Sequence, residues 1–430
     1  MATKRLPTLL LAIVAGVGAA NTYYLQPLLH VVSVSLHLSG GNAGFLVTVT
    51  QAGFVVGLGV LLPLGDRYDR RWLIVLSLLL AGLFDLGAGL VTGTISFGVS
   101  LLGVGIFSVV AQFAVTYVAA AAPAEIRSSE IAKVMAGLLA GIVLARTYSG
   151  AMSDLLGYHS VFIVAAAISV LLAAIVWMRL PAESAKHPLT IVEMWRDGAM
   201  LLRDEPILRL RSFLGMLSFG SFSIFWTTMA FALSAHPYHL SSGLIGLFGF
   251  AGLAGVLAAR AVGALADRGH TAFTTVVSFV LIALSYLAFY LTHDSLILFI
   301  VLTATLDAGI QGAHLSNQSL IYRLAPGAQG RITMVYMVFY FLGGVIGSSL
   351  ASVLYGIGGW PYVTIAGTLA GTLGLVVWGV LAVRERRWVA AIGNEDSTIE
   401  QTGELTNDGS SHSMDERIDE RASEKEHQRE

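Results

Sequence analysis

The chain lacks cysteine entirely, and only 12% of its 430 residues are charged. Without cysteine, neither disulfide bonds nor thiolate metal sites are available. Soluble domains carry about 25% charged residues, so the scarcity of charge indicates a protein whose solvent is lipid. Hydrophobic residues make up 55% of the chain, and its mean hydropathy is +0.75.

The sequence also lacks the motifs of common phosphate and metal sites. It has no Gly-x-x-x-x-Gly-Lys-Ser/Thr loop, which excludes an ATP-driven motor of that kind. No His-Glu-x-x-His pattern or cysteine cluster suggests a metal. We therefore expect no enzymatic activity, no cofactor and no metal site.

Charged residues are unevenly distributed along the chain. Residues 394–430 contain 12 acidic and 4 basic side chains, so the net charge of −2 hides a basic body. The bases of that body are scattered among short loops and do not cluster on one element, which excludes nucleic acid as a partner. A basic body suits a protein whose loops face an anionic membrane leaflet.

Long apolar runs dominate the first nine-tenths of the chain. Runs of roughly 20 residues can cross the ~30 Å hydrocarbon core of a bilayer as helices. Continuous runs exclude a β-barrel, whose strands alternate in hydrophobicity. The sequence predicts twelve membrane-spanning helices, at 7–30, 42–64, 72–91, 94–121, 130–152, 158–178, 208–233, 242–264, 270–291, 295–322, 331–355 and 360–382.

The twelve helices divide into two sets of six, so we expect an all-α membrane protein built from two six-helix pseudo-repeats. The first half is 1–178 and the second is 208–390. Between them, 179–207 is a cytoplasmic central loop, in which an amphipathic helix can lie on the membrane surface. The acidic tail 391–430 has too few large apolar residues to form a core, and we expect it to be disordered.

Lysine and arginine occur on only one side of the predicted membrane. They lie at both termini and in alternate loops, whereas the loops near 31–41, 92–93, 153–158, 234–241, 292–294 and 356–359 contain none. Because cytoplasmic loops carry an excess of Lys and Arg, this asymmetry predicts that both termini are cytoplasmic. We expect a multi-pass protein of the inner (plasma) membrane that is monomeric.

A cluster of charged residues lies between two apolar runs, at 61–71. A similar cluster lies about two hundred residues later, at 263–270. The simplest interpretation is that the basic residues only anchor the cytoplasmic ends of helices. An acid is not required for that role, yet Asp-Arg occurs in both stretches. A carboxylate at a helix boundary can hold a neighbouring helix end or an arginine, which predicts a gate. The gating candidates are Asp66, Arg67, Arg70, Arg71, Asp267 and Arg268.

The first of these stretches resembles the loop signature of the major facilitator superfamily, Gly-x-x-x-Asp-Arg-x-Gly-Arg-Arg/Lys. Leu62 and Asp69 stand where the signature has glycine, and the second stretch keeps only Gly263, Asp267 and Arg268. Three further stretches resemble the drug- and sugar-efflux branch that is related to arabinose-efflux permeases: 20–29, 137–150 and 335–344. The resemblance implies a secondary transporter whose helices 1, 4, 7 and 10 line a central cavity.

One departure from the family pattern concerns proton coupling. Many proton-coupled members carry an arginine in helix 4, four residues before a glycine. Aligned on Gly103, that position is Val99 in this chain. Coupling through that arginine is therefore not available here.

The predicted helix 295–322 carries four polar residues on one stripe. At 100° per residue, its polar side chains fall within roughly 60° of one another. A polar stripe on an apolar membrane helix predicts a water-lined cavity, the alternative being a polar network that holds helices together. Asp307 is our first choice for a protonatable coupling group. The stripe consists of Asp307, Gln311, His314 and Gln318.

Arg146 lies within the predicted helix 130–152 and is not needed for helix packing. It suits a counter-ion to Asp307 or Asp85, or a ligand for an anionic substrate group. Alternatively, Asp85 serves only as a structural partner of Arg146. Arg260, near the end of its helix, can extend its charge to the membrane surface.

Further polar and aromatic residues within apolar runs are candidates for the cavity wall. Asn21 and Tyr24 lie within the first run, where the tyrosine is alternatively part of an interfacial aromatic belt. Gln112 and Trp226 are further candidates, although aromatic residues in membrane helices more often serve packing. The same holds for Gln51, Tyr336 and Tyr340.

Together these features predict a secondary transporter that exports a small drug- or sugar-like molecule in exchange for protons. Its partners are the lipid bilayer, that molecule and protons. A uniporter or importer of a sugar or small organic anion, with Arg146 as the anion ligand, is the alternative. A substrate-sensing receptor that signals through its acidic tail is a third possibility.

Overall fold

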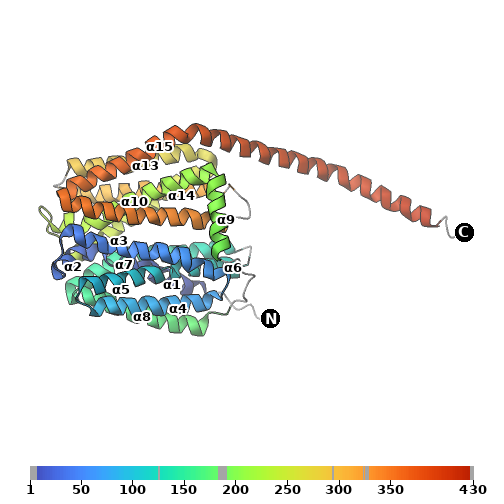
Figure 1. The fold of residues 1–430 in the computed structure, drawn as a ribbon. Coiled ribbons are helices and arrows are strands. Elements are labelled where there is room, and N and C mark those ends of the chain that lie inside the picture. The colour runs from blue at the N-terminus through green and yellow to red at the C-terminus, as the bar shows by residue number, and fades with distance from the viewer. Residues whose placement is uncertain are drawn as a thin grey trace. The chain divides into compact units, whose positions relative to one another are not determined.

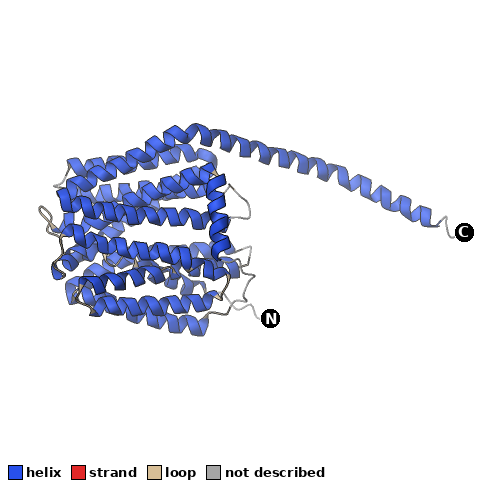
Figure 2. Cartoon of the chain, viewed as in Figure 1, coloured by secondary structure: helices blue, strands red, loops and turns tan. Residues whose placement is uncertain are grey.

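The computed structural model describes residues 7–123, 126–182, 191–292, 295–322, 324 and 329–426. Within these ranges, the side chains of residues 66, 191, 258, 260, 261, 267, 329, 330 and 383–426 are not described. Every regular element in the described residues is helical (Figure 2). This agrees with the all-α fold that the apolar runs predict.

The first half of the chain supplies six membrane-spanning segments (Figure 1). Three of them contain more than one helical element. The elements are α1 (Thr8–Asn21), η1 (Gln26–Leu28), α2 (Leu29–Ser35), α3 (Gly40–Val60), η2 (Leu62–Asp66), α4 (Arg70–Leu90), α5 (Thr94–Phe107), α6 (Val110–Ala121), α7 (Arg127–Leu156) and α8 (Tyr158–Arg179).

The central loop contains the helix α9, as the sequence predicts, and the second half follows it. The elements are α9 (Ile191–Asp204), α10 (Pro206–Ser234), α11 (Ser242–Gly246), α12 (Phe248–Leu265), η3 (Ala266–His270), α13 (Thr271–Leu291), α14 (Leu296–Ile321) and α15 (Gln329–Glu426). η3 is a π-helical turn in which Gly269 has a φ of 91°, so a residue without Cβ suits the position.

Among the described residues, eleven segments are long and apolar enough to cross a membrane. The last, Arg331–Ala382, has 52 residues, which is about twice the length that a bilayer requires. Gly358 and Gly359 leave helical geometry within it, with φ −145° and +66°. This break divides α15 into two crossings and yields the twelve spans that the sequence predicts.

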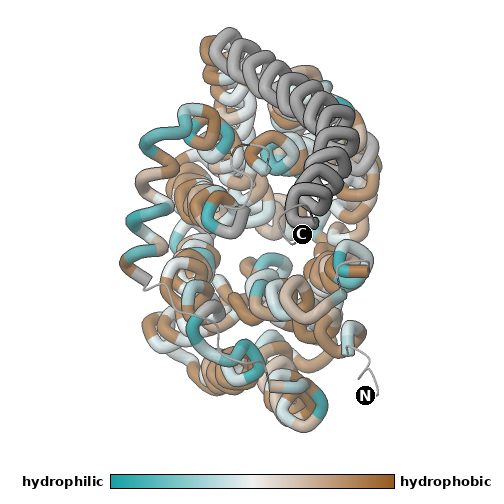
Figure 3. Tube along the Cα trace, turned by 90° about the vertical axis from the view of Figure 1, so that its right-hand side faces the viewer, coloured by the Kyte–Doolittle hydropathy of each residue, from teal (hydrophilic) through white to brown (hydrophobic). Residues whose placement is uncertain are grey.

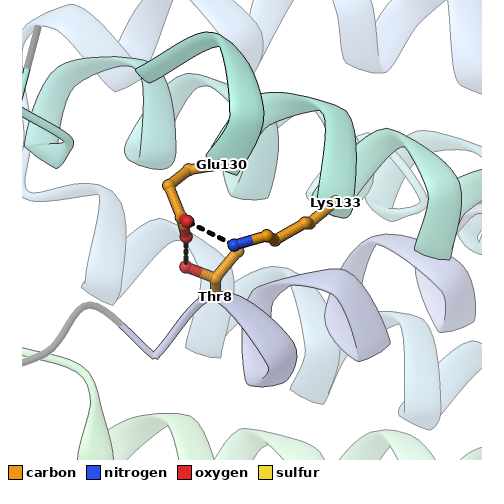
Figure 4. Close-up of polar contacts among 3 residues, drawn as sticks. All are labelled: Thr8, Glu130 and Lys133. Atoms are coloured by element: carbon orange, nitrogen blue, oxygen red, sulfur yellow. Dashed lines mark hydrogen bonds and ion pairs between the residues drawn. The ribbon is translucent and has the colours of Figure 1, made fainter. Parts of the chain in front are cut away.

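The two ends of the helical bundle differ in charge. We call the end with the loops at 66–69, 122–126, 180–205 and 266–270 the basic end, and the end with the loops at 36–39, 91–93, 157 and 235–241 the base-free end. At the basic end, Glu130 accepts hydrogen bonds from Thr8 Oγ1 and, at 2.6 Å, from Lys133 Nζ, which ties α7 to the start of α1 (Figure 4). Figure 3 looks onto this end and shows hydrophilic residues gathered at helix ends and on the central-loop helix.

Helix pairs within each half pack through small residues. A Cβ on Gly137 of α7 would lie 2.4 Å from the carbonyl oxygen of Ala12 on α1, and one on Gly141 would lie 2.1 Å from that of Gly16. Such approaches are open only to glycine, because no other residue leaves room for the facing backbone. The glycine stretch 137–150 therefore fixes α7 against α1.

Residues Val377–Glu430 form a separate compact unit. The backbone of α15 is helical through this unit up to Glu426, whereas its composition predicts a disordered tail. Helix formation there is a local property of the chain, because composition leaves few apolar side chains to bury. The division at residue 391 remains a prediction.

Candidate functional site

A cavity of about 300 Å³ lies in the first compact unit, between the two halves. Its wall is formed by α6 and α7 of the first half, by α10, α12, α14 and α15 of the second, and by the turn after α1. Cavities of this size are at the lower end of those that hold small molecules. We call it the central cavity.

The predicted polar stripe of α14 forms one side of the central cavity. All four of its members, Asp307, Gln311, His314 and Gln318, lie in the wall. His314 Nδ1 is 2.9 Å from the hydroxyl of Tyr336, and its ring lies 4.4 Å from that of Tyr340. The helical spacing read from the sequence thus places these four residues correctly.

Arg146 and Asp307 both contact the indole of Trp226. The guanidinium of Arg146 lies over the Trp226 ring, 3.6 Å from its centroid. At the edge of the same ring, Trp226 Nε1 donates a hydrogen bond of 3.3 Å to Asp307 Oδ1. The two charges are therefore coupled through an aromatic ring that both stabilises the cation and donates to the carboxylate.

The position of Arg146 is fixed by groups on three sides. Arg146 Nε donates to Gln26 Oε1 at 2.9 Å, and the guanidinium also lies 5.0 Å from the ring of Tyr23. The side chain is 3% exposed, and its Nη2 atom has no hydrogen-bond partner among the described residues. One donor of a buried guanidinium is thus available at the cavity.

Glycines of α12 bring Asp307 and Arg146 close to that helix. A Cβ on Gly252 would lie 2.4 Å from Asp307 Oδ2, and one on Gly249 would lie 3.5 Å from Arg146 Cβ. A larger residue at Gly252 would displace the carboxylate. The small residues of this helix therefore define where the acid sits.

The other cavity candidates are divided by the structure. Gln112 lies in the wall of the central cavity. Trp226 is not among the lining residues, but it donates a hydrogen bond to Asp307, which is. Asn21 and Tyr24 are not among its lining residues. Instead, the neighbouring Tyr23 lines the cavity, as do Phe219, Phe222, Tyr340 and Phe341.

Tyr23 and Tyr24 lie in the turn between α1 and η1, and their side chains have different surroundings. The sequence suggests an interfacial aromatic belt as the alternative role of these tyrosines, and it does not indicate which of the two lines the cavity. Tyr24 faces Tyr148 of α7, with ring centroids 5.5 Å apart, and lines a separate apolar groove between α1, α7 and α8. Gln51 also lies outside the central cavity wall and donates from Nε2 to Ser223 Oγ at 3.1 Å.

The predicted gating residues lie at the basic end. The guanidinium of Arg71 stacks over Trp177 at 4.3 Å and donates to its carbonyl oxygen, and Arg70 is buried. Arg67 lies 5.6 Å from the ring of Tyr68, and Arg268 is exposed. The side chains of Asp66 and Asp267 are outside those described, so the gating pairs remain a prediction.

Both halves meet tightly at the base-free end. On α7, a Cβ on Gly150 would lie 2.2 Å from the carbonyl oxygen of Ser242, and Asp154 Oδ2 accepts from Gly243 N at 2.9 Å. On α3, a Cβ on Gly41 would lie 2.7 Å from the carbonyl oxygen of Ser352 on α15. We call these contacts the glycine seal, because backbone packs directly on backbone.

The lining of the central cavity extends in the opposite direction. Met135 and Gln318 belong to its wall and lie in the parts of α7 and α14 nearer the basic end. There, α9 contacts both halves: Trp195 Nε1 donates to the carbonyl oxygen of Gly59 at 2.9 Å, and Asp197 pairs with Arg331 at 2.7 Å. The cavity is thus sealed at one end and bridged by a surface helix at the other.

Among the described residues, membrane-spanning segments in two halves surround a cavity with charged and polar groups in its wall, which indicates a membrane transport protein. A family model described as Major Facilitator Superfamily matches residues 11–348 and, in a second match, 211–409. The chain belongs to this superfamily, as the loop signature predicts.

Curated relatives carry transporter names. The chain is 41% identical over 373 residues to the "putative uncharacterized transporter YgaY" of Escherichia coli K12, which covers 86% of this chain and 94% of that protein. It is 31% identical over 389 residues to a "probable transporter" of Streptomyces coelicolor, with coverage of 90% and 89%. The "inner membrane transport protein YnfM" of Escherichia coli K12 is 25% identical over 352 residues, with coverage of 79% and 82%.

Solved structures share the fold at low identity. A mutant of the nucleoside transporter NupG superimposes with a TM-score of 0.72 at 13% identity, covering 86% of this chain and 99% of that one. A bacterial homologue of the lysosomal transporter Spinster, in an inward-facing conformation, gives 0.69 at 15% identity, covering 87% and 95%. These likenesses show the fold alone.

Proposed function

We propose that this transporter exports a small organic molecule across the inner membrane in exchange for protons. The observation that carries this proposal is the placement of Asp307 in the wall of the central cavity, coupled to Arg146 through Trp226. A carboxyl group inside a membrane is costly unless it is neutral or paired, and such groups mark ion pathways. Within this one site, Asp307 can be neutral or can be paired with Arg146.

The proposed cycle uses the two charges of the cavity wall. When Asp307 is ionised, its charge is balanced by the nearby Arg146, and a substrate with donor groups can bind to the carboxylate. When Asp307 takes up a proton, that attraction is lost and substrate is released. Competition between proton and substrate for one carboxylate produces exchange.

The described conformation fits one stage of that cycle. If the basic end is cytoplasmic, as the distribution of Lys and Arg predicts, the glycine seal closes the outer side and the cavity faces the cytoplasm. Rocking of the halves would open the seal and close the basic end. Asp66, Arg67, Asp267 and Arg268 belong to stretches of the chain at that end, which supports a gating role for them.

The cavity wall supports a substrate that is amphiphilic and contains an aromatic or alicyclic face. Aromatic rings of Tyr23, Phe219, Phe222 and Phe341 face Gln311 and Asp307 across about 300 Å³. Rings offer stacking surfaces, whereas the amide and carboxyl groups fix orientation. This composition is consistent with the drug- and sugar-efflux branch that the sequence resembles.

A uniporter or importer of a small organic anion is the second candidate. The unpartnered Nη2 of Arg146 favours it, because a guanidinium binds carboxylate or phosphate groups well. In that case Arg146 binds the substrate, and Asp307 only balances its charge.

Counterflow in proteoliposomes distinguishes the two candidates. A ligand-stabilisation screen of the purified protein first supplies the substrate. Transport of the labelled substrate against its own concentration gradient is then measured with and without a protonophore. Uphill transport that disappears with the protonophore supports antiport, whereas net flux that ignores it supports the uniporter.

A further inference from the structure

A second group of buried polar side chains lies inside the first half, apart from the central cavity. Asp85 on α4 is 0% exposed, and neither of its carboxyl oxygens has a hydrogen-bond partner among the described residues. The same is true of the amide of Asn21 on α1, which is 2% exposed, and of the hydroxyl of Ser169 on α8, which is 0% exposed. Three unpartnered polar groups in one half of a bundle are unusual, because buried polar atoms normally have partners.

The helical register places these groups at one level of the membrane. Helices α1 and α4 both begin at the basic end, at Thr8 and Arg70. Asn21 lies thirteen residues beyond Thr8, and Asp85 lies fifteen beyond Arg70, or about 20 and 23 Å along the two axes. The two side chains therefore reach similar depth.

Helix α8 joins the group from the third side. A Cβ on Gly82, one turn from Asp85 on α4, would lie 3.2 Å from Ser169 Cβ. Ser169 is thus presented to the face of α4 that carries Asp85. The first half brings together an acid, an amide and a hydroxyl from three helices.

The remaining neighbours are aromatic and uncharged. Asp85 is close enough to Tyr24 and Tyr148 to interact electrostatically with both. The hydroxyl of Tyr148 already donates to the carbonyl oxygen of Val161 at 3.0 Å. No described Lys, Arg or His forms an ion pair with Asp85, and Arg146 is held on the other side of α7 by Gln26 and Trp226.

The backbone beside Asn21 is not helical. Helix α1 ends at Asn21, and Thr22–Leu25 form a turn before η1 begins at Gln26. Backbone hydrogen bonds in this turn run to the carbonyls of Ala19, Ala20 and Tyr23. Interrupted helices inside membrane transporters offer carbonyl oxygens to small cations.

We propose that Asp85, Asn21 and Ser169 form a binding site for a monovalent metal cation, and that the bound cation is Na⁺. The carboxylate would balance the charge of the ion, and the amide and hydroxyl oxygens are the hard ligands that such a cation prefers. A bound cation satisfies all three unpartnered groups at once. The site is separate from Asp307, so it adds a second ion to a transporter whose proposed coupling uses the first.

Thermal unfolding of the purified full-length protein tests this site. The probe is NaCl, exchanged for choline chloride or KCl at constant ionic strength and pH. We expect Na⁺ to raise the Tm of the wild type by at least about 3 °C, because a ligand that binds only the folded state stabilises it. Asp85→Asn removes the charge with little change of shape and should abolish the shift, whereas the matched control Asp307→Asn should retain it.

The substitutions Asn21→Ala and Ser169→Ala should raise the Na⁺ concentration for half-maximal stabilisation several-fold. Binding of ²²Na⁺ to the wild type and to Ser169→Ala provides the same comparison if Asp85→Asn does not fold. The proposal is overturned if Na⁺ and K⁺ give equal shifts, if Asp85→Asn keeps the shift, or if only acidification stabilises the wild type. Because Asp307→Asn is a control here, loss of proton coupling and loss of Na⁺ binding are distinguishable.

Discussion

The glycine seal at the base-free end makes a quantitative prediction about Gly150. A Cβ at this position would lie 2.2 Å from Ser242 O, 2.9 Å from Ser242 C and 3.1 Å from Gly243 Cα. All three atoms are backbone, so no flexible side chain can yield, and the helices must separate. Overpacking of this kind costs about 1–3 kcal/mol. Gly150→Ala should therefore shift the equilibrium away from the sealed conformation by about 5- to 150-fold.

The absence of cysteine makes this shift measurable. A single cysteine at Gln311, in the wall of the central cavity, is the sole thiol in the chain. Labelling with a membrane-impermeant maleimide is compared in right-side-out and inside-out vesicles. We expect Gly150→Ala to increase labelling from the side of the base-free end and to decrease it from the other side.

Gly98→Ala is the matched control for this experiment. It adds the same methyl group to a membrane helix, but the nearest heavy atom to its Cβ is 4.0 Å away. Both changes also give the same gain in helix propensity. Unchanged labelling with Gly150→Ala, or an equal change with Gly98→Ala, would refute the role of the seal.

Three further predictions concern other parts of the chain. Trp226→Phe keeps a ring beneath Arg146 but removes the hydrogen bond to Asp307, worth about 1.5–3 kcal/mol when the acceptor is charged, so proton-driven uptake into inside-out vesicles should fall at least about tenfold. Asp197→Asn breaks the ion pair with Arg331 on the exposed helix α9, so labelling of the cavity cysteine should change by less than about fivefold. Removal of residues 394–430 should leave transport intact, whereas a receptor that signals through its tail would lose function.

The sequence predicts the fold well because membrane helices depend on simple physics. A backbone in lipid must satisfy its own hydrogen bonds, so each long apolar run becomes a helix. Of the breaks at Thr22–Leu25 and Gly358–Gly359, the sequence predicts only the second. The second lies where the sequence places a loop without charge, whereas the first lies inside a continuous apolar run.

The candidate site was predictable where one helix carries it. The spacing of Asp307, Gln311, His314 and Gln318 on α14 sufficed to place them on one face. Contacts between helices were not predictable in the same way. Nothing in the spacing of Trp226 indicates that its indole contacts both Arg146 and Asp307, because that depends on how three helices pack.

Uphill transport by Asp307→Asn tests the central claim of proton exchange at the cavity most directly. Inside-out vesicles with an imposed pH gradient are supplied with the substrate found by the stabilisation screen, and exchange without a gradient is measured in parallel. We predict that Asp307→Asn retains exchange between equal pools but loses accumulation driven by the gradient, as well as its dependence on pH. Accumulation equal to that of the wild type, with the same pH dependence, would contradict the account.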